Sequence, residues 1–274
     1  MVTVEDTVLR QVSEGLDGFM DPLIEQLKDP DADVRAAAIE TAVGMPDEQL
    51  IERLQTLVLT SDTGPDGRES AALVLGRIEH PCGVRFLTDL MQAEDATIRG
   101  LAALGMSQQQ TPQAVSFLIA GLNDPVNTVR NIAERSLLSI IETVREAGIP
   151  ELLSLLEHEQ PLTRSPAARI LGATQATEAR EPLLRVMQTD THWLSRLWAA
   201  KALGDLGDVR AFSALVEVLQ QDEKNRVRAA AAEAIGRLRA PGSADVLRQA
   251  LSDSDEGVRK RIEESLEELS HTGA

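Results

Sequence analysis

The sequence predicts an all-α solenoid, a superhelical stack of about eight helical hairpins, and three observations support this prediction. First, 43% of the 274 residues are hydrophobic but only 2% are aromatic, with four Phe, two Trp and no Tyr. Sheet cores draw on large aromatic and β-branched side chains, so this composition favours close-packed helices. Second, one arginine-containing pattern recurs along the chain. Third, every period carries two apolar stretches at helical spacing.

The recurring arginine is here called the marker arginine. The repeats are numbered 1 to 8 in the order of their marker arginines. The marker arginine stands before a run of small residues and recurs at a nearly constant spacing. A fixed period of about 20–50 residues is typical of repeat architectures. Each repeat is expected to hold a first helix with paired aliphatic residues, a short polar turn and a second helix with the marker arginine. The marker arginines are Arg35, Arg68, Arg99, Arg130, Arg164, Arg196, Arg228 and Arg259.

The elements follow from this numbering, within one domain that covers residues 1–274. Residues 1–18 are expected to form an N-terminal cap helix, residues 19–255 the stacked hairpins, and residues 256–274 a C-terminal cap helix and tail. Terminal repeats must present a polar face to solvent, and the last helix is rich in glutamate. The first helix carries one apolar stripe, made of Val4, Val8, Val12 and Leu16.

Acidic or hydroxyl residues recur at two fixed positions before the marker arginine. The residue two before it, Asp33, Asp66, Thr97 or Thr128 in repeats 1 to 4, is expected to cap the second helix. An aspartate stands six before it in six repeats, and we expect these aspartates to form a ladder of ion pairs between neighbouring turns. Such pairs fix the stacking register more than they add stability. They are Asp29, Asp62, Asp124, Asp190, Asp222 and Asp253.

The repeated segments resemble the HEAT family, in particular the short HEAT-like repeats named after phycobilisome bilin lyases. The segments that carry the resemblance are DADVRAAAIETAVG at 31–44, NRVRAAAAEAIGRL at 225–238 and AAKALGDLGDVRAFSALVEVL at 199–219. The resemblance covers residues 19–270 and implies stacked hairpins whose second helices line a concave groove. It specifies the fold and leaves the function open, because such repeats serve many roles.

Charge and composition exclude several classes of partner. The net charge of −17 opposes broad nucleic-acid binding and attachment to anionic lipid. No apolar run approaches the ~20 residues of a membrane span, and we expect a cytoplasmic protein. Residues 1–66 hold 15 acidic and 4 basic residues. This acidic end is interpreted either as an aid to solubility, including in a salty cytoplasm, or as a surface that selects a basic partner.

No motif predicts catalysis, a metal site or a cofactor. Phosphate-binding and nucleophile motifs are missing, and the single cysteine, Cys82, follows Pro81 without a partnered histidine. The pair His158-Glu159 resembles the His-Glu motif of an iron hydroxylase family built from HEAT repeats, but that family carries the motif four times. We therefore expect a non-enzymatic protein. The histidines are scattered, as His80, His158, His192 and His271.

A basic strip in the groove is the predicted binding site. The residues five after the marker arginine include Arg135, Arg169 and Lys201 in successive repeats, with Leu197 and Trp198 beside them. Aromatic and arginine residues dominate binding energy at protein interfaces. The strip is expected to hold an acidic segment of another protein, or an anionic small ligand. In the alternative interpretation, Trp198 only fills a packing gap between helices.

The sequence thus predicts a protein-binding scaffold or adaptor that uses its groove. A second hypothesis, implied by the family resemblance, is a bilin lyase subunit or chaperone-like factor that binds a tetrapyrrole and a phycobiliprotein. The propionates of a tetrapyrrole would suit the basic strip. A third hypothesis, a HEAT-fold DNA glycosylase, is disfavoured because the chain is strongly acidic.

Overall fold

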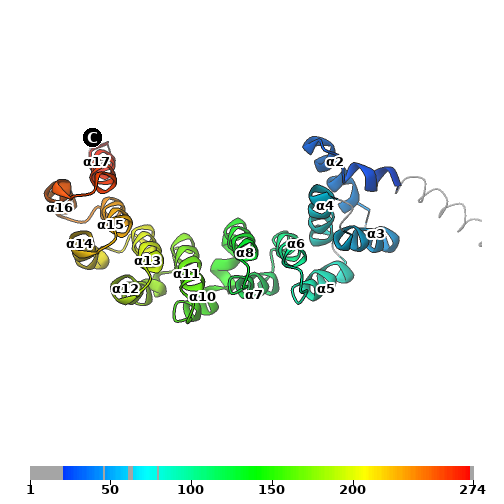
Figure 1. Ribbon diagram of the computed structural model, residues 1–274, viewed down its shortest axis with the longest axis horizontal. Coiled ribbons are helices and arrows are strands. Elements are labelled where there is room, and N and C mark those ends of the chain that lie inside the picture. Colours follow the sequence, from blue (N-terminus) through cyan, green and yellow to red (C-terminus); the bar gives the residue numbers. More distant parts are fainter. Residues whose placement is uncertain (1–20, 46, 61–63, 79, 272–274) are drawn as a thin grey trace, which may run out of the picture. The chain divides into compact units, whose positions relative to one another are not determined.

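The computed structural model describes residues 21–45, 47–60, 64–78 and 80–271, and these residues form helices and turns without any strand (Figure 1). The predicted all-α solenoid is confirmed. The expected N-terminal cap helix at 1–18 lies outside the described residues. The chain divides into two compact units, Met1–Ser136 (unit 1) and Leu137–Ala274 (unit 2), which are described separately below.

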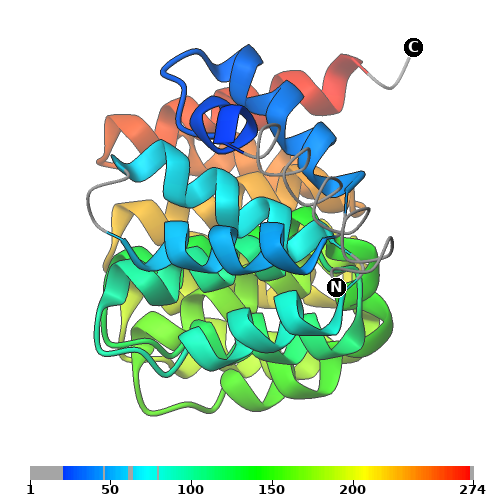
Figure 2. The same ribbon diagram turned by 90° about the vertical axis from the view of Figure 1, so that its right-hand side faces the viewer.

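Unit 1 contains the first hairpins of the stack. Helical residues 21–26 precede α2, which is the second helix of repeat 1. The two helices of a hairpin pack on each other, as α3 on α4 and α5 on α6, and the second helices α2, α4 and α6 stack in sequence. Figure 2 shows α3 and α4 lying side by side. The helices are α2 (Ala32–Val43), α3 (Glu48–Leu59), α4 (Gly64–Arg77), α5 (Pro81–Leu90), α6 (Ala96–Met106), α7 (Pro112–Gly121) and α8 (Asn127–Ser139, which crosses into unit 2).

Unit 2 repeats this arrangement with longer second helices. The second helices α11, α13, α15 and α17 form one layer, and each packs on the next. The first helices lie on the other side of this layer. The elements are α9 (Ile141–Ala147), α10 (Ile149–Leu155), α11 (Pro161–Thr174), η2 (Thr177–Ala179), α12 (Arg180–Thr189), α13 (Trp193–Leu206), η3 (Val209–Ala211), α14 (Phe212–Gln221), α15 (Asn225–Leu238), α16 (Ser243–Gln249), η4 (Ala250–Ser252) and α17 (Glu256–His271).

Small residues allow successive second helices to approach closely. Ala200 and Ala231 are fully buried between helices of unit 2. A Cβ atom on Gly204 would lie 2.7 Å from the Cα atom of Ala234, and one on Gly172 would lie 2.6 Å from the Cα atom of Ala202. No side chain fits at those distances. The leucine-glycine pairs of the sequence therefore mark the crossing points of the second helices.

The predicted helix caps are wrong by two positions. The helices α2 and α6 are capped by Asp31 and Asp95, whose side chains accept hydrogen bonds from the backbone N–H groups of Asp33 and Thr97. Asp66 and Thr128 lie inside α4 and α8. The second helix begins two residues, about half a turn, earlier than predicted, so the capping residue of α2 and α6 stands four positions before the marker arginine.

Residues 256–271, within the range predicted for a C-terminal cap helix and tail, form α17. Val258, Ile262 and Ser265 are buried against the preceding hairpin. The opposite side exposes Glu263 and Glu267 to solvent. The role of a cap, which needs such a polar face, stays a prediction.

Candidate protein-binding surface

The marker arginines have structural partners on both sides. In repeat 6 the Nη1 atom of Arg196 donates to the backbone carbonyl of Asp190, at 2.9 Å. Its Nε and Nη2 atoms donate to the carboxylate of Asp222 in the next repeat, at 2.8 and 3.0 Å. Each such guanidinium ties its own turn to the following turn. The predicted ladder of ion pairs is confirmed at four steps: Arg99 with Asp124, Arg164 with Asp190, Arg196 with Asp222 and Arg228 with Asp253. The ladder residue Asp62 lies outside the described residues.

The ladder carboxylates are held in their charged form. The pKa values of Asp124 and Asp253 lie below the ordinary value, mainly because Arg99 and Arg228 hydrogen-bond to these carboxylates. Burial raises the pKa of Asp190, but the hydrogen bond from Arg164 and neighbouring bonds outweigh it, and the net shift is downward. These arginines and aspartates bind one another, which gives them a structural role.

The ladder is incomplete where the sequence lacks the aspartate. Ala93 and His158 occupy its position in repeats 3 and 5. Arg68 is the marker arginine of repeat 2, so its ladder partner would stand at the position of Ala93. Its Nε atom instead donates to the backbone carbonyl of Val58, at 2.8 Å. His158 instead accepts a hydrogen bond at Nδ1 from the backbone N–H of Gln160, at 3.1 Å, and so closes the turn before α11.

Three of the predicted site residues meet on the second-helix layer of unit 2. The guanidinium carbon of Arg169, on α11, lies 4.8 Å from the centre of the Trp198 ring on α13. The Nζ atom of Lys201 lies 5.8 Å from the same ring. All three side chains are half-buried, as is Leu197 beside them. Arg169, Leu197, Trp198 and Lys201 are here called the Trp198 cluster.

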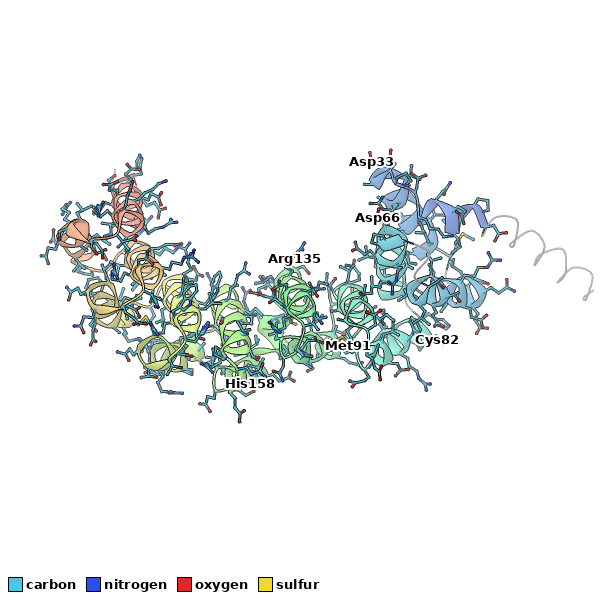
Figure 3. All side chains as sticks on the ribbon, viewed as in Figure 1. Asp33, Asp66, Cys82, Met91, Arg135 and His158 are labelled. Carbon is cyan, nitrogen blue, oxygen red and sulfur yellow. The ribbon has the colours of Figure 1, made fainter. Side chains whose placement is uncertain are left out.

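Arg135 belongs to the other unit. It is exposed on α8 and points away from α7 (Figure 3). The structure therefore groups the unit 2 members of the predicted strip and describes Arg135 by itself.

An ion network joins the Trp198 cluster to the next two helices. Lys201 pairs with Glu233 of α15 at 3.0 Å, and Glu233 also pairs with Arg237 at 2.7 Å and with Arg261 of α17 at 3.8 Å. Arg237 in turn pairs with Asp205. Burial raises the pKa of Glu233, but its hydrogen bond with Lys201 and the three nearby cations lower it overall. Lys201 is thus already neutralised, and the strip is less basic than its sequence suggests.

The pairing of Glu233 with Lys201 was not predicted from the sequence. Glu233 occupies the position of Lys201 in the next repeat, and Arg237 in the same way occupies the position of Asp205. Opposite charges at one repeat position in successive repeats were therefore a signal for inter-repeat ion pairs.

The residues considered for catalysis are separated from one another. Cys82 is exposed in the first turn of α5, and its backbone N–H donates to Nδ1 of His80, at 3.3 Å. In the described part of the chain, no group of three or more His, Cys, Asp or Glu side chains is placed to hold a metal ion. Across the same residues, no helix has the length and apolar character needed to cross a bilayer.

Surface hollows occur away from the Trp198 cluster. One is lined by Met187, Val218, Arg196 and Asp222, and it lies between the first helices α12 and α14 at the ladder turns. Another is lined by Ile24, Glu52, Arg53 and Leu57 in unit 1. Both hollows are open to solvent.

Two relatives each match about half of this chain in sequence. A HEAT repeat-containing taxis protein of Halobacterium salinarum is 29% identical over 144 residues, which are 52% of this chain and 31% of the relative. An uncharacterized phycocyanin operon protein Z of Pseudanabaena tenuis is 28% identical over 159 residues, which are 55% of this chain and 74% of the relative. The chain thus spans about a third of the taxis protein's length.

Solved structures with the same fold include importin beta. That structure has a TM-score of 0.60 and 15% identity, and the match covers 92% of this chain and 40% of importin beta. A chain from a structure of Kap95p with RanGDP has a TM-score of 0.63 and 16% identity, with 93% of this chain and 40% of that chain covered. At these identities the likeness concerns the fold alone.

The family model of HEAT repeats matches almost the whole described chain. Its matches fall on residues 20–81, 57–138, 149–234 and 190–267. They include all eight marker arginines and the leucine-glycine crossing points. The chain belongs to the HEAT-repeat family.

Proposed function

We propose that this chain is a non-enzymatic scaffold that binds another protein through the second-helix layer of unit 2, with Trp198 at the centre. The observation that carries the proposal is the guanidinium of Arg169 stacked 4.8 Å from a half-buried indole. A core tryptophan would be buried by its neighbours, whereas Trp198 is only half-buried. Tryptophan and arginine are the residues most enriched at the energetic centres of interfaces.

The partner segment that suits this cluster carries a carboxylate. An acidic side chain would contact Arg169 while an apolar neighbour packs on Trp198 and Leu197. Lys201 contributes only if the partner competes with Glu233, which lies 3.0 Å away. This requirement favours a carboxylate or another compact anion over a diffuse negative surface. An anionic small ligand of the same chemistry would use the same residues.

The test is a comparison of partner capture by matched variants. The full chain and its variants Trp198→Ala, Arg169→Glu and Arg185→Glu are immobilised and exposed to extract from the native cell. Arg185 is exposed on α12, outside the second-helix layer, so Arg185→Glu controls for charge. We expect a protein that the parent and Arg185→Glu retain and that the other two variants lose. Retention by all four chains would refute the proposed site.

A second candidate function rests on the phycocyanin operon relative. In this case the chain is a chaperone-like factor or lyase subunit, and the Trp198 cluster holds an open-chain tetrapyrrole. The rings of the pigment would stack on the indole and its propionates would pair with Arg169. Titration of the protein with bilin separates the two candidates. A red-shifted, intensified visible band that Trp198→Ala abolishes would favour the pigment, and an unchanged bilin spectrum would exclude it.

A further inference from the structure

The chain's other tryptophan lies on a different surface of unit 2. Trp193 is the first residue of α13 and is half-buried. The guanidinium carbon of Arg226, at the start of α15, lies 5.6 Å from the centre of its ring. The ring of His192 stacks on it at a centroid distance of 6.2 Å. A cationic side chain therefore lies beside each tryptophan of the chain, but only Trp198 belongs to the predicted groove.

Arg226 differs from the other arginines of this layer in its partners. The marker arginines are held by carboxylates and carbonyls, and Arg237 is held by Glu233 and Asp205. Arg226 is exposed, and no acidic side chain lies within ion-pair distance of it among the described residues. The nearby Asp255 accepts a hydrogen bond from the side chain of Asn225, at 2.6 Å. Arg226 thus presents an uncompensated guanidinium beside an indole.

Apolar side chains extend this surface toward α11. Leu162 and Leu194 occupy the same position as Arg226, two residues before the marker arginine, in the two preceding repeats. Leu162 is 46% exposed, although most leucines of the chain are buried. The starts of α11 and α13 are neighbours, since Oγ of Ser195 donates to the backbone carbonyl of Pro161 at 3.5 Å. Leu162, Trp193, Leu194 and Arg226 are here called the edge surface.

We infer that the edge surface is a second docking site, for a peptide segment in which a carboxylate stands next to a large apolar side chain. Arg226 supplies the charge that complements the carboxylate, with donors arranged for a bidentate contact. The apolar area comes from Trp193, Leu194 and Leu162. These side chains are partly shielded from water and lie in the first turns of α13 and α11. The remainder of the chain repels acidic segments through its net charge of −17. A local unpaired cation therefore sets where such a segment binds.

Tryptophan fluorescence can report on binding at each surface separately, because each surface holds one of the two tryptophans. The variant Trp198→Phe leaves Trp193 as the only indole and reports on the edge surface. The variant Trp193→Phe leaves Trp198 and reports on the Trp198 cluster. Phenylalanine keeps an apolar ring at either position, so both variants should fold, which far-ultraviolet circular dichroism checks.

The probes are peptides selected from a random seven-residue display library against the full parent chain. We expect selected sequences that place Asp or Glu within two positions of Leu, Phe or Met. Added as synthetic peptides, some of them should change the emission of Trp198→Phe, while peptides that bind the Trp198 cluster, which suits the same chemistry, should change the emission of Trp193→Phe. In the Trp198→Phe background, Arg226→Glu should weaken binding at least tenfold, while Arg185→Glu should leave it within twofold.

Three results would overturn the inference. They are a selection without acidic peptides, peptides that change only the emission of Trp193→Phe, and binding that survives Arg226→Glu. The second of these results would at the same time support the proposed function at the Trp198 cluster. Failure of the edge surface and failure of the proposed function are therefore distinguishable.

Discussion

Units 1 and 2 are built from the same hairpin, but among the described residues the ladder of ion pairs runs through more successive repeats in unit 2. There, Arg164, Arg196 and Arg228 each hold a carboxylate of the next repeat. In unit 1, Arg99 does so, whereas Arg68 binds a backbone carbonyl. The second helices stack in both units. The ladder is therefore an addition to a stack whose basis is the close packing of small residues.

The free faces of the second helices differ as well. Five residues after the marker arginine, unit 1 has the half-buried leucines Leu73 and Leu104, while unit 2 has the paired Lys201 and Glu233. Residues 1–136 hold 22 acidic and 10 basic residues, and residues 137–274 hold 22 and 17. Unit 2 thus carries most of the cations and both tryptophans. The repeat pattern determines packing, and under the proposed function the positions it leaves unspecified would determine recognition.

The largest expected effect comes from a charge in the packed layer. Ala231 is fully buried in unit 2 and Ala103 is fully buried in unit 1, so Ala231→Asp and Ala103→Asp should each cost about 3–5 kcal/mol. Both tryptophans lie in unit 2, so fluorescence reports on that unit while circular dichroism reports on all helices. Ala231→Asp should lower the midpoint of the fluorescence transition in urea, and Ala103→Asp should lower only part of the circular dichroism transition.

Ala173→Asp, at an exposed position of α11, is the control and should be nearly neutral. If Ala103→Asp lowers the fluorescence midpoint as much as Ala231→Asp does, the two units unfold together. They then have one common free energy of unfolding and cannot be compared in stability.

A smaller effect is expected at a crossing point of the second helices. Gly204→Ala places a methyl group 2.7 Å from the Cα atom of Ala234, and relief of this overlap should cost about 1–3 kcal/mol. Gly44→Ala is the matched control, because its nearest contact would be an ordinary 3.5 Å. Urea unfolding of both variants measures the difference, and a Gly204→Ala chain as stable as the parent would mean that close packing does not hold the stack.

The ladder predicts a dependence on acid. The pKa values of Asp124 in unit 1 and Asp253 in unit 2 lie below the ordinary 3.8, mainly through Arg99 and Arg228. A carboxyl whose pKa falls on folding stabilises the protein fully above its unfolded value, and the contribution disappears as pH drops through the folded value. Asp253→Asn should therefore lower stability at pH 7 by about 1–3 kcal/mol and make it less sensitive to pH below 3.8. Unfolding midpoints at stepwise lower pH test this, and parallel curves for parent and variant would contradict it.

The smallest effect on stability, with the sharpest effect on binding, is expected from the predicted basic strip. Arg135→Glu and Arg169→Glu should each change the free energy of unfolding by about 0–1 kcal/mol, because both arginines contact solvent. Arg169→Glu should abolish partner binding through repulsion of the partner's carboxylate. Arg135→Glu measures whether unit 1 takes part in that contact. A loss of folding in either variant would identify the arginine as structural and remove it from the site.

The fold was predictable because each element repeats. The near-constant spacing of the marker arginines determined the number and order of the hairpins before any contact was known. The caps were misplaced because Asp33 and Asp31 are both good capping residues, and only the backbone shows that α2 begins at Ala32. Of the site, Trp198 was recognisable as one of only two tryptophans, and Arg169 by the repeat position that it shares with Lys201. The ion pair between Lys201 and Glu233 was not predicted, because the basic strip was identified from like charges at one repeat position, whereas the fold pairs opposite charges of adjacent repeats.

The equal spacing of the crossing points has an evolutionary consequence. Gly172 meets Ala202 and Gly204 meets Ala234 with the same separation along the chain, and Arg164 and Arg196 likewise each reach the aspartate of the next turn. Removal of residues 165–196 would join Arg164 to Leu197, bring Asp222 into the place of Asp190, and leave Gly204 facing Ala234. The contacts on the C-terminal side of the deletion would be ones that the parent already makes, and residues 197–206 would take the place of residues 165–174 against α9 and α10. Chain length in this protein is therefore open to change by gain or loss of whole repeats, with one altered interface at each event.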